Sequence, residues 1–208
     1  MPLQNRVTPT GDIVAVPARG MFMGNRGILH DDKRQLGPGR WKHKAWIICL
    51  LSFRGRRRVP MTPHRYTELF FLDEAVAIAA GHRPCFECRR QDSCAWQSAW
   101  RDGNGLADLP RAPAMDDVLH AERAVRGGRR QKTWTAAADA LADGVFVLLD
   151  GVPHLMHAGS LHPWSHDGYG APRPVPHGVA LTVLTPPASV GALRGGYRPV
   201  LHGTVAGA

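Results

Sequence analysis

The sequence is short of several features that would decide a class of protein at once. It has four cysteines among 208 residues, no internal repeat, and no apolar run near the ~20 residues of a membrane-spanning helix. Residues 1–6 lack the charged-then-apolar layout of a secretory signal. These absences argue against a disulfide framework, a repeat array and a membrane partner, and they predict a cytoplasmic location.

Negative charge is scarce in the first third of the chain. Residues 1–72 hold 13 Lys and Arg against four Asp and Glu, whereas residues 73–208 hold 13 of each kind. The whole formal excess of +9 therefore lies in the first third. Such a surface suits a polyanion, so the sequence predicts a nucleic acid or another phosphate-bearing ligand as partner. A basic surface kept only for solubility is the alternative.

The order of apolar runs and breakers predicts an α+β fold. We expect mixed or antiparallel β-strands and a helical central segment that carries a CxxC knuckle. A single domain would span residues 1–208. It would consist of a basic β-rich part (1–65), a part with the knuckle and helices (66–130), and a second β-rich part (131–208).

Local signals place individual elements. Asp73 is a good N-cap and Gly81 a good C′ glycine, so a short apolar helix should lie between them. Asp150 and Gly151 form a strong hairpin turn. A last short helix should begin with Thr185 as its N-cap. Further strands are expected over 12–16, 45–53, 66–72, 145–149, 152–156 and 179–184, and further helices over 89–101 and 114–126.

The most specific motif is the stretch Gly81-His82-Arg83-Pro84-Cys85-Phe86-Glu87-Cys88. It sets two thiols three positions apart on a tight turn, and structural zinc sites usually take four Cys or His ligands. Cys85 and Cys88 are therefore predicted zinc ligands, with Cys49 and His64 as candidates for completing the site. No second CxxC pair is present. Redox work by the pair, unmetallated structural cysteines, and Cys49 as a core thiol are the alternatives.

The segment Phe71-Leu72-Asp73-Glu74-Ala75, followed by Ala80-Gly81-His82-Arg83-Pro84-Cys85-Phe86-Glu87-Cys88-Arg89, resembles the second half of the Ada-type metal-binding domain. In that family a phenylalanine-containing strand leads into a small alanine helix and then Gly-x-Arg-Pro-Cys-x-x-Cys. Over residues 66–90 the resemblance implies a zinc-bound, DNA-contacting module related to repair, with Cys85 and Cys88 as two ligands. The family's first cysteine pair, which includes its methyl acceptor, has no counterpart upstream, where Cys49 stands alone.

Arginine is the residue that matches a phosphate with a planar fork of donors, and it gathers around the end of the 45–53 run and around the knuckle. The arginines that we expect to contact phosphates are Arg54, Arg56, Arg57, Arg58, Arg83, Arg89 and Arg90.

No complete catalytic constellation is visible. The best candidates lie in a polar, glycine-spaced segment, where Arg26 would bind phosphate and His30 with Asp31 would transfer a proton. An exposed polar loop is the alternative. The leading hypothesis is thus a nucleic-acid-binding protein with a zinc-knuckle-like CxxC. Its rivals are an enzyme that acts on a phosphate-bearing substrate through Arg26, His30 and Asp31, and a structural or interaction domain.

Overall fold

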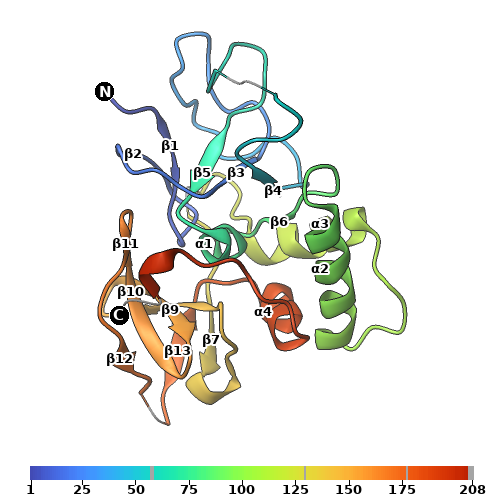
Figure 1. The fold of residues 1–208 in the computed structure, drawn as a ribbon, viewed down its shortest axis with the longest axis vertical. Coiled ribbons are helices and arrows are strands. Elements are labelled where there is room, and N and C mark those ends of the chain that lie inside the picture. Colours follow the sequence, from blue (N-terminus) through green and yellow to red (C-terminus); the bar gives the residue numbers. More distant parts are fainter. Residues whose placement is uncertain (57–58, 129, 177, 206–208) are drawn as a thin grey trace.

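In a computed structural model of the chain, two β-sheets lie at opposite ends of the molecule and one short helix lies between them (Figure 1). The structure describes residues 1–56, 59–128, 130–176 and 178–205. The predicted α+β class is confirmed, with one mixed sheet and one antiparallel sheet. No helix in these described ranges is both long and apolar enough to span a membrane.

The first sheet has six strands in the order β2-β1-β5-β3-β4-β6. The pairs β1–β5 and β4–β6 are parallel, and the other neighbours are antiparallel. The strands are β1 (Gln4–Val7), β2 (Ile13–Ala15), β3 (Phe22–Asn25), β4 (Ile47–Leu50), β5 (Leu69–Phe71) and β6 (Arg83–Pro84).

The second sheet follows the order β11-β10-β9-β8-β13-β7, with β12 paired to β10, and all its pairs are antiparallel. The expected hairpin turn is present, since Asp150 and Gly151 have φ of 51° and 76°, as a type I′ turn requires. The strands are β7 (Trp134–Ala137), β8 (Phe146–Leu149), β9 (Val152–His157), β10 (Ser160–Ser165), β11 (Gly168–Tyr169), β12 (Arg173–Pro174) and β13 (Ala180–Val183).

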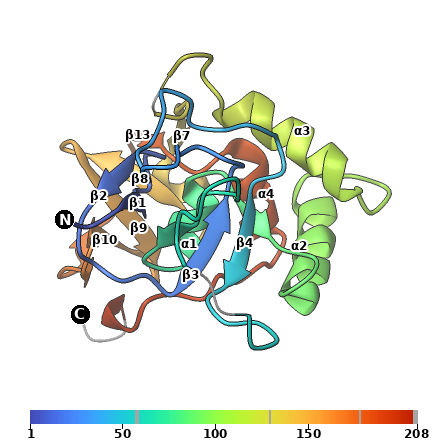
Figure 2. The same cartoon turned by 90° about the horizontal axis from the view of Figure 1, so that it is seen from above.

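Three longer helices gather on one side of the two sheets (Figure 2). They are α2 (Arg90–Gly103), α3 (Ala112–Arg123) and α4 (Pro187–Arg194), and short 3₁₀ turns cover Ala138–Ala140 and Gly203–Val205. Helices α2 and α4 pack directly together. A Cβ atom at Gly103 would lie 1.7 Å from the carbonyl oxygen of Gly191, so only glycine permits this approach.

Helix α1 (Glu74–Ala79) is wholly buried between the sheets. Asp73 caps it as predicted, and its Oδ1 accepts from Val76 N at 3.0 Å. One hydrophobic core runs without a break from Val7 in the first sheet through α1 to Val205. The central helix therefore holds the two sheets on a common core.

Candidate metal centre

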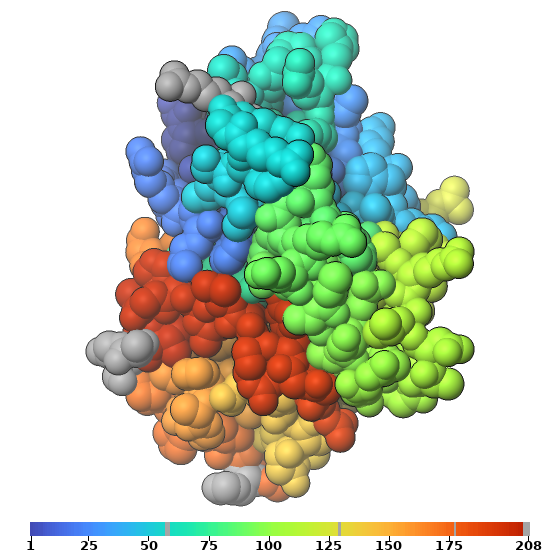
Figure 3. All heavy atoms as spheres, turned by 45° about the vertical axis from the view of Figure 1, so that its right-hand side comes forward, coloured from blue at the N-terminus to red at the C-terminus, as the bar shows by residue number. Residues whose placement is uncertain are grey.

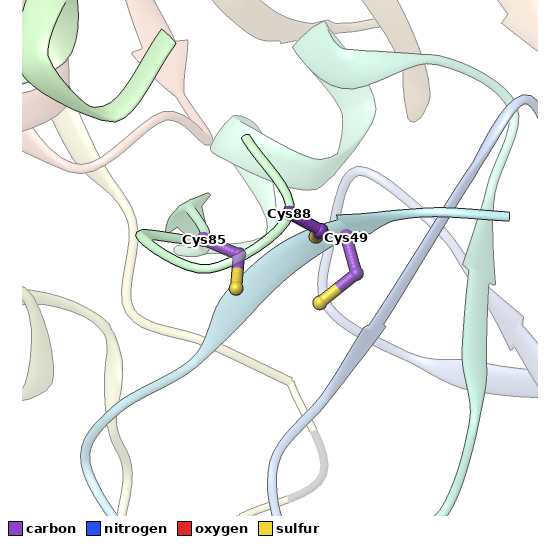
Figure 4. Close-up of side chains that lie close together, drawn as sticks. All are labelled: Cys49, Cys85 and Cys88. Carbon is purple, nitrogen blue, oxygen red and sulfur yellow. The ribbon is translucent and has the colours of Figure 1, made fainter. Parts of the chain in front are cut away.

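Three of the four cysteines meet on the outer face of the first sheet, away from the main core. Their Sγ atoms all lie within 4.8 Å of one another (Figure 4). Cys49 belongs to β4, and Cys85 directly follows β6, the parallel neighbour of β4. The Cys85 amide donates to the Ile48 carbonyl at 3.0 Å, which sets the two cysteines side by side. Since side chains alternate along a strand, Ile48 enters the core while Cys49 faces the opposite way.

The turn from Cys85 to Cys88 aims backbone donors at sulfur. Glu87 N donates to the Sγ of Cys85 at 3.4 Å, and the amide of Cys88 also lies in hydrogen-bond reach of that sulfur. Hydrogen bonds of this kind stabilise the ionised thiolate that metals bind. The cluster sits in apolar surroundings, with Met23, Ile47, Tyr66 and Phe70 packed around it.

The three thiols perturb one another's ionisation. A hydrogen bond from Cys49, with further ones from the amides of Cys88 and Glu87, lowers the pKa of Cys85 to about 5, although burial opposes the shift. The hydrogen bond to Cys85 and then burial raise the pKa of Cys49, and burial raises the pKa of Cys88. Together these directions describe a cluster that carries one negative charge readily and resists the next. A bound cation removes that resistance.

The dimensions fit a metal ion. A Zn–S bond of about 2.3 Å with tetrahedral angles places ligand sulfurs about 3.8 Å apart, which is compatible with the 4.8 Å limit on the three Sγ atoms. These cysteines can therefore hold a metal ion. Among the described residues, no other group of three or more Cys, His, Asp or Glu side chains is arranged to do so.

The structure brings Cys49 to the predicted pair but leaves the other candidate ligand outside. The His64 side chain is 87% exposed and lies 3.9 Å from a carboxylate oxygen of Asp32. The structure therefore does not place His64, one of the two candidates for completing the site, with the cysteines. Cys94 is exposed on α2 and takes no part in the cluster. The described residues therefore provide three thiol ligands, and the fourth position of a tetrahedral metal site has no thiol.

Two arginines expected to contact phosphates are instead buried structural residues. Arg83 makes a two-pronged contact with Asp116 at 2.8 and 2.7 Å. Arg89 lies 2.7 Å from Glu74, and its guanidinium stacks over Phe22 at 4.6 Å. A buried guanidinium requires such partners. Asp116 and Glu74 are distant in sequence, and only Asp92, which Arg89 Nε contacts at 2.9 Å, is a local partner. This corrects the prediction for Arg83 and Arg89.

The other expected phosphate contacts divide into two groups. Arg54, Arg56 and Arg90 are exposed, as a contact with a large anion requires. Arg56 also pairs with Glu87 of the knuckle at 2.5 Å, so the loop after β4 lies against the turn that carries the thiols. Figure 3 shows this cyan loop against the green segment that starts at the knuckle. Arg57 and Arg58 lie outside the described residues.

The proposed catalytic residues do not converge on one point. Arg26 is buried beneath the sheet, where it donates to the carbonyl oxygen of Gly11 at 3.2 Å and stacks on Trp46 at 4.2 Å. His30 and Asp31 instead line an open cavity of about 870 Å³, and Arg26 is not among the residues that line it. A joint role of the three residues on one substrate is not supported by this arrangement.

The remaining two candidates already have structural partners. The His30 ring nitrogens contact Thr67 Oγ1 at 2.6 Å and the Thr62 carbonyl at 3.2 Å. The Asp31 carboxylate accepts from the amides of Lys33 and Gln35, both at 2.9 Å. These hydrogen bonds shape the loop, and neither ring nitrogen of His30 is left as a base.

No family model matches the chain, and neither does any curated protein or solved structure.

Proposed function

We propose that this is a zinc protein whose ion is held by Cys49, Cys85 and Cys88. The observation that carries the proposal is the gathering of three thiols within 4.8 Å, two from the knuckle and one from a strand far away in sequence. Thiolates favour Zn²⁺, Cu⁺ or iron–sulfur clusters, and the common clusters need four cysteines. Zinc accepts three sulfurs with a nitrogen or oxygen donor in the fourth position, which matches this donor set.

The position without a thiol bears on what such a centre does. Structural zinc sites are usually closed by four protein ligands, whereas three protein ligands leave room for water or a substrate atom, which the ion polarises. Around the three cysteines the chain supplies an apolar shell from Met23, Ile47 and Phe70.

The test is the zinc content of purified protein and of matched cysteine variants. We expect one zinc per chain in the wild type and in Cys94→Ser, whose thiol is exposed and remote from the cluster. In Cys49→Ser the zinc affinity should fall by more than the 10- to 100-fold that the loss of an outer-shell contact costs. Equal zinc in Cys49→Ser and Cys94→Ser, or no zinc in wild type grown with zinc, would refute the proposal.

We also propose that the basic first third binds nucleic acid. Eight of the eleven described Lys and Arg in residues 1–72 are exposed, whereas Glu68 is buried and Asp12 pairs with Arg130 at 2.9 Å. The exposed cations of this segment therefore outnumber its exposed acidic residues, which are Asp31 and Asp32. The contact between Arg56 and Glu87 places part of this charge beside the proposed zinc centre. A role in repair rests on the Ada-type resemblance alone.

The salt dependence of binding tests this second proposal. Affinity for duplex DNA should fall with salt by a log–log slope of roughly 0.9 for each phosphate neutralised. The double variant Arg54→Gln/Arg56→Gln should weaken binding to all sequences and flatten the slope. The control, Arg111→Gln/Arg126→Gln, changes two exposed arginines in the charge-balanced part. Similar losses in the two variants, or no binding at low salt, would contradict the proposal.

A further inference from the structure

The outer face of the first sheet continues beyond the cysteines to an arginine. Across neighbouring strands, Arg6 of β1 stands opposite Phe70 of β5, Phe70 opposite Met23 of β3, and Met23 opposite Cys49 of β4. Residues in register point to the same face of a sheet. The four residues thus form one row across four strands, with Cys49 at one end and Arg6 at the other, and their backbone positions lie about 14 Å apart. The Arg6 guanidinium leans back over the Phe70 ring, 4.9 Å from its centroid.

A cavity of about 380 Å³ opens at the arginine end of this row. Arg6 and Arg19 supply its charge, and Leu3, Leu51 and Phe70 supply much of its apolar wall. No acidic side chain is among the described residues that line it. Its volume is within the usual range for small-molecule sites, about 300–1,000 Å³.

The two arginines retain donor capacity. Arg6 donates through Nε to the Ala18 carbonyl and through Nη1 to Asn5 Oδ1, and its guanidinium lies over the Phe70 ring. Its Nη2 has no hydrogen-bond partner in the described part of the chain. Arg19 is exposed and makes no side-chain hydrogen bond or ion pair there. Burial and then the charge of Arg19 lower the pKa of Arg6, so the two like charges act on each other with no acid between them.

The backbone fixes this pair against the sheet. A Cβ atom at Gly20 would lie 2.0 Å from the Phe71 carbonyl oxygen, so only glycine lets the connection from β2 to β3 lie directly on β5. The next amide, Met21 N, donates to the Leu72 carbonyl at 3.0 Å. Arg19 therefore starts from a fixed backbone position at the cavity, which lowers the entropic cost of holding a ligand.

We propose that this cavity binds a phosphate monoester. Two guanidinium groups match the charge of a phosphate dianion and the geometry of its oxygens. The organic part of the ester would lie against Leu51 and Phe70, and Phe70 also packs against the cysteine cluster. A free metabolite and the terminal phosphate of a nucleic-acid strand present the same group, and the experiment separates these sources.

The experiment is calorimetric titration of the full-length protein with two probe pairs at low salt. One pair is phenyl phosphate and phenol, and the other is a short single-stranded oligonucleotide with and without a 5′-phosphate. We expect binding of the phosphorylated member of at least one pair and at least tenfold weaker binding of its partner. Binding of phenyl phosphate indicates a small ester, and binding of the phosphorylated oligonucleotide alone indicates a strand end.

Arg19→Ala should weaken binding of the phosphorylated probe about tenfold, since one charge-assisted contact is lost. Arg126→Ala, which also removes an exposed arginine without a side-chain partner among the described residues, should change nothing. Equal binding by Arg19→Ala and wild type, or no binding of any phosphorylated probe, would overturn the proposal. The proposed phosphate site contains no metal ligand, so binding of the phosphorylated probe should be the same after metal is removed with a chelator. Failure of this proposal can therefore be told apart from failure of the zinc proposal.

Discussion

At the residue scale, the buried arginine side chains need the most compensation, because a buried charge is costly unless it has partners. The Trp46 ring contacts two guanidinium groups, that of Arg26 at 4.2 Å and that of Arg123 at 3.8 Å from the ring centroid. Arg26 donates to the carbonyl of Ala80 and Arg123 to that of Gly81, both at the C-terminal end of α1. That end of a helix carries partial negative charge, so it offsets two cations that make no hydrogen bond to a carboxylate of the described residues.

His82 stays neutral in the middle of this group. Its Nδ1 contacts the Ala77 carbonyl at 3.2 Å, so Nδ1 carries the proton and Nε2 accepts from Arg26 Nε at 3.3 Å. Burial first, and then the charges of Arg26 and Arg123, hold the pKa of His82 well below its usual range. Below pH ~6.5 the unfolded chain therefore binds a proton at this position that the folded chain does not.

We expect His82 to make the protein less stable in acid. The free energy of unfolding should fall as the pH drops below about 6.5, and His82 should contribute up to about 1.4 kcal/mol per pH unit. Urea unfolding at pH 7.5 and pH 5.5 measures the loss, and His82→Gln should reduce it. The control His64→Gln changes an exposed ring and should leave the loss as in wild type. An unchanged loss in His82→Gln would show that another group is responsible.

At the scale of elements, the sequence predicted those helix ends and turns that are determined by residues close together in the chain. Asp73 and Gly81 bound α1 as expected, and Gly81 takes φ of +77° with Arg123 packed where a Cβ would lie. The strand expected over 45–53 is shorter, because the chain turns outward after β4 and leaves Leu51 half exposed. The prediction of Thr185 as an N-cap was wrong. Its hydroxyl accepts from Phe146 N at 2.9 Å, and α4 begins at Pro187.

Elements specified by distant partners could not be predicted in this way. Strand β1 was missed because it has a short, mixed sequence and is held by parallel pairing with β5, more than sixty residues away. The same difference between local and distant information applies to the candidate metal site. The CxxC spacing predicted Cys85 and Cys88 from neighbours in sequence. The sequence named Cys49 and His64 as further candidates without choosing between them. Cys49 joins the pair because β4 and β6 pair in parallel, and that pairing depends on the whole sheet.

The proposed zinc centre, at the scale of the whole molecule, is connected to the second sheet by buried polar contacts. Arg89, next to Cys88, pairs with Glu74 at 2.7 Å. The same carboxylate accepts from the Tyr197 hydroxyl at 2.6 Å and from Val200 N at 3.0 Å. Its neighbour Asp73 accepts from the hydroxyl of Tyr169 in β11 at 2.8 Å. With the continuous core, these contacts indicate one cooperative unit.

Removal of metal should therefore loosen both sheets together. A ligand at 100 times its Kd stabilises the folded state by about 2.7 kcal/mol, so chelation should speed exchange of globally protected amides roughly 100-fold. Hydrogen exchange measured with and without chelator should show this change in β4 and equally in β8 and β9, although the second sheet contains no cysteine. Cys49→Ser, which lacks one ligand, should respond far less. If only amides near β4 and β6 exchange faster, the sheets open separately, and the contacts of Asp73 and Glu74 do not couple them.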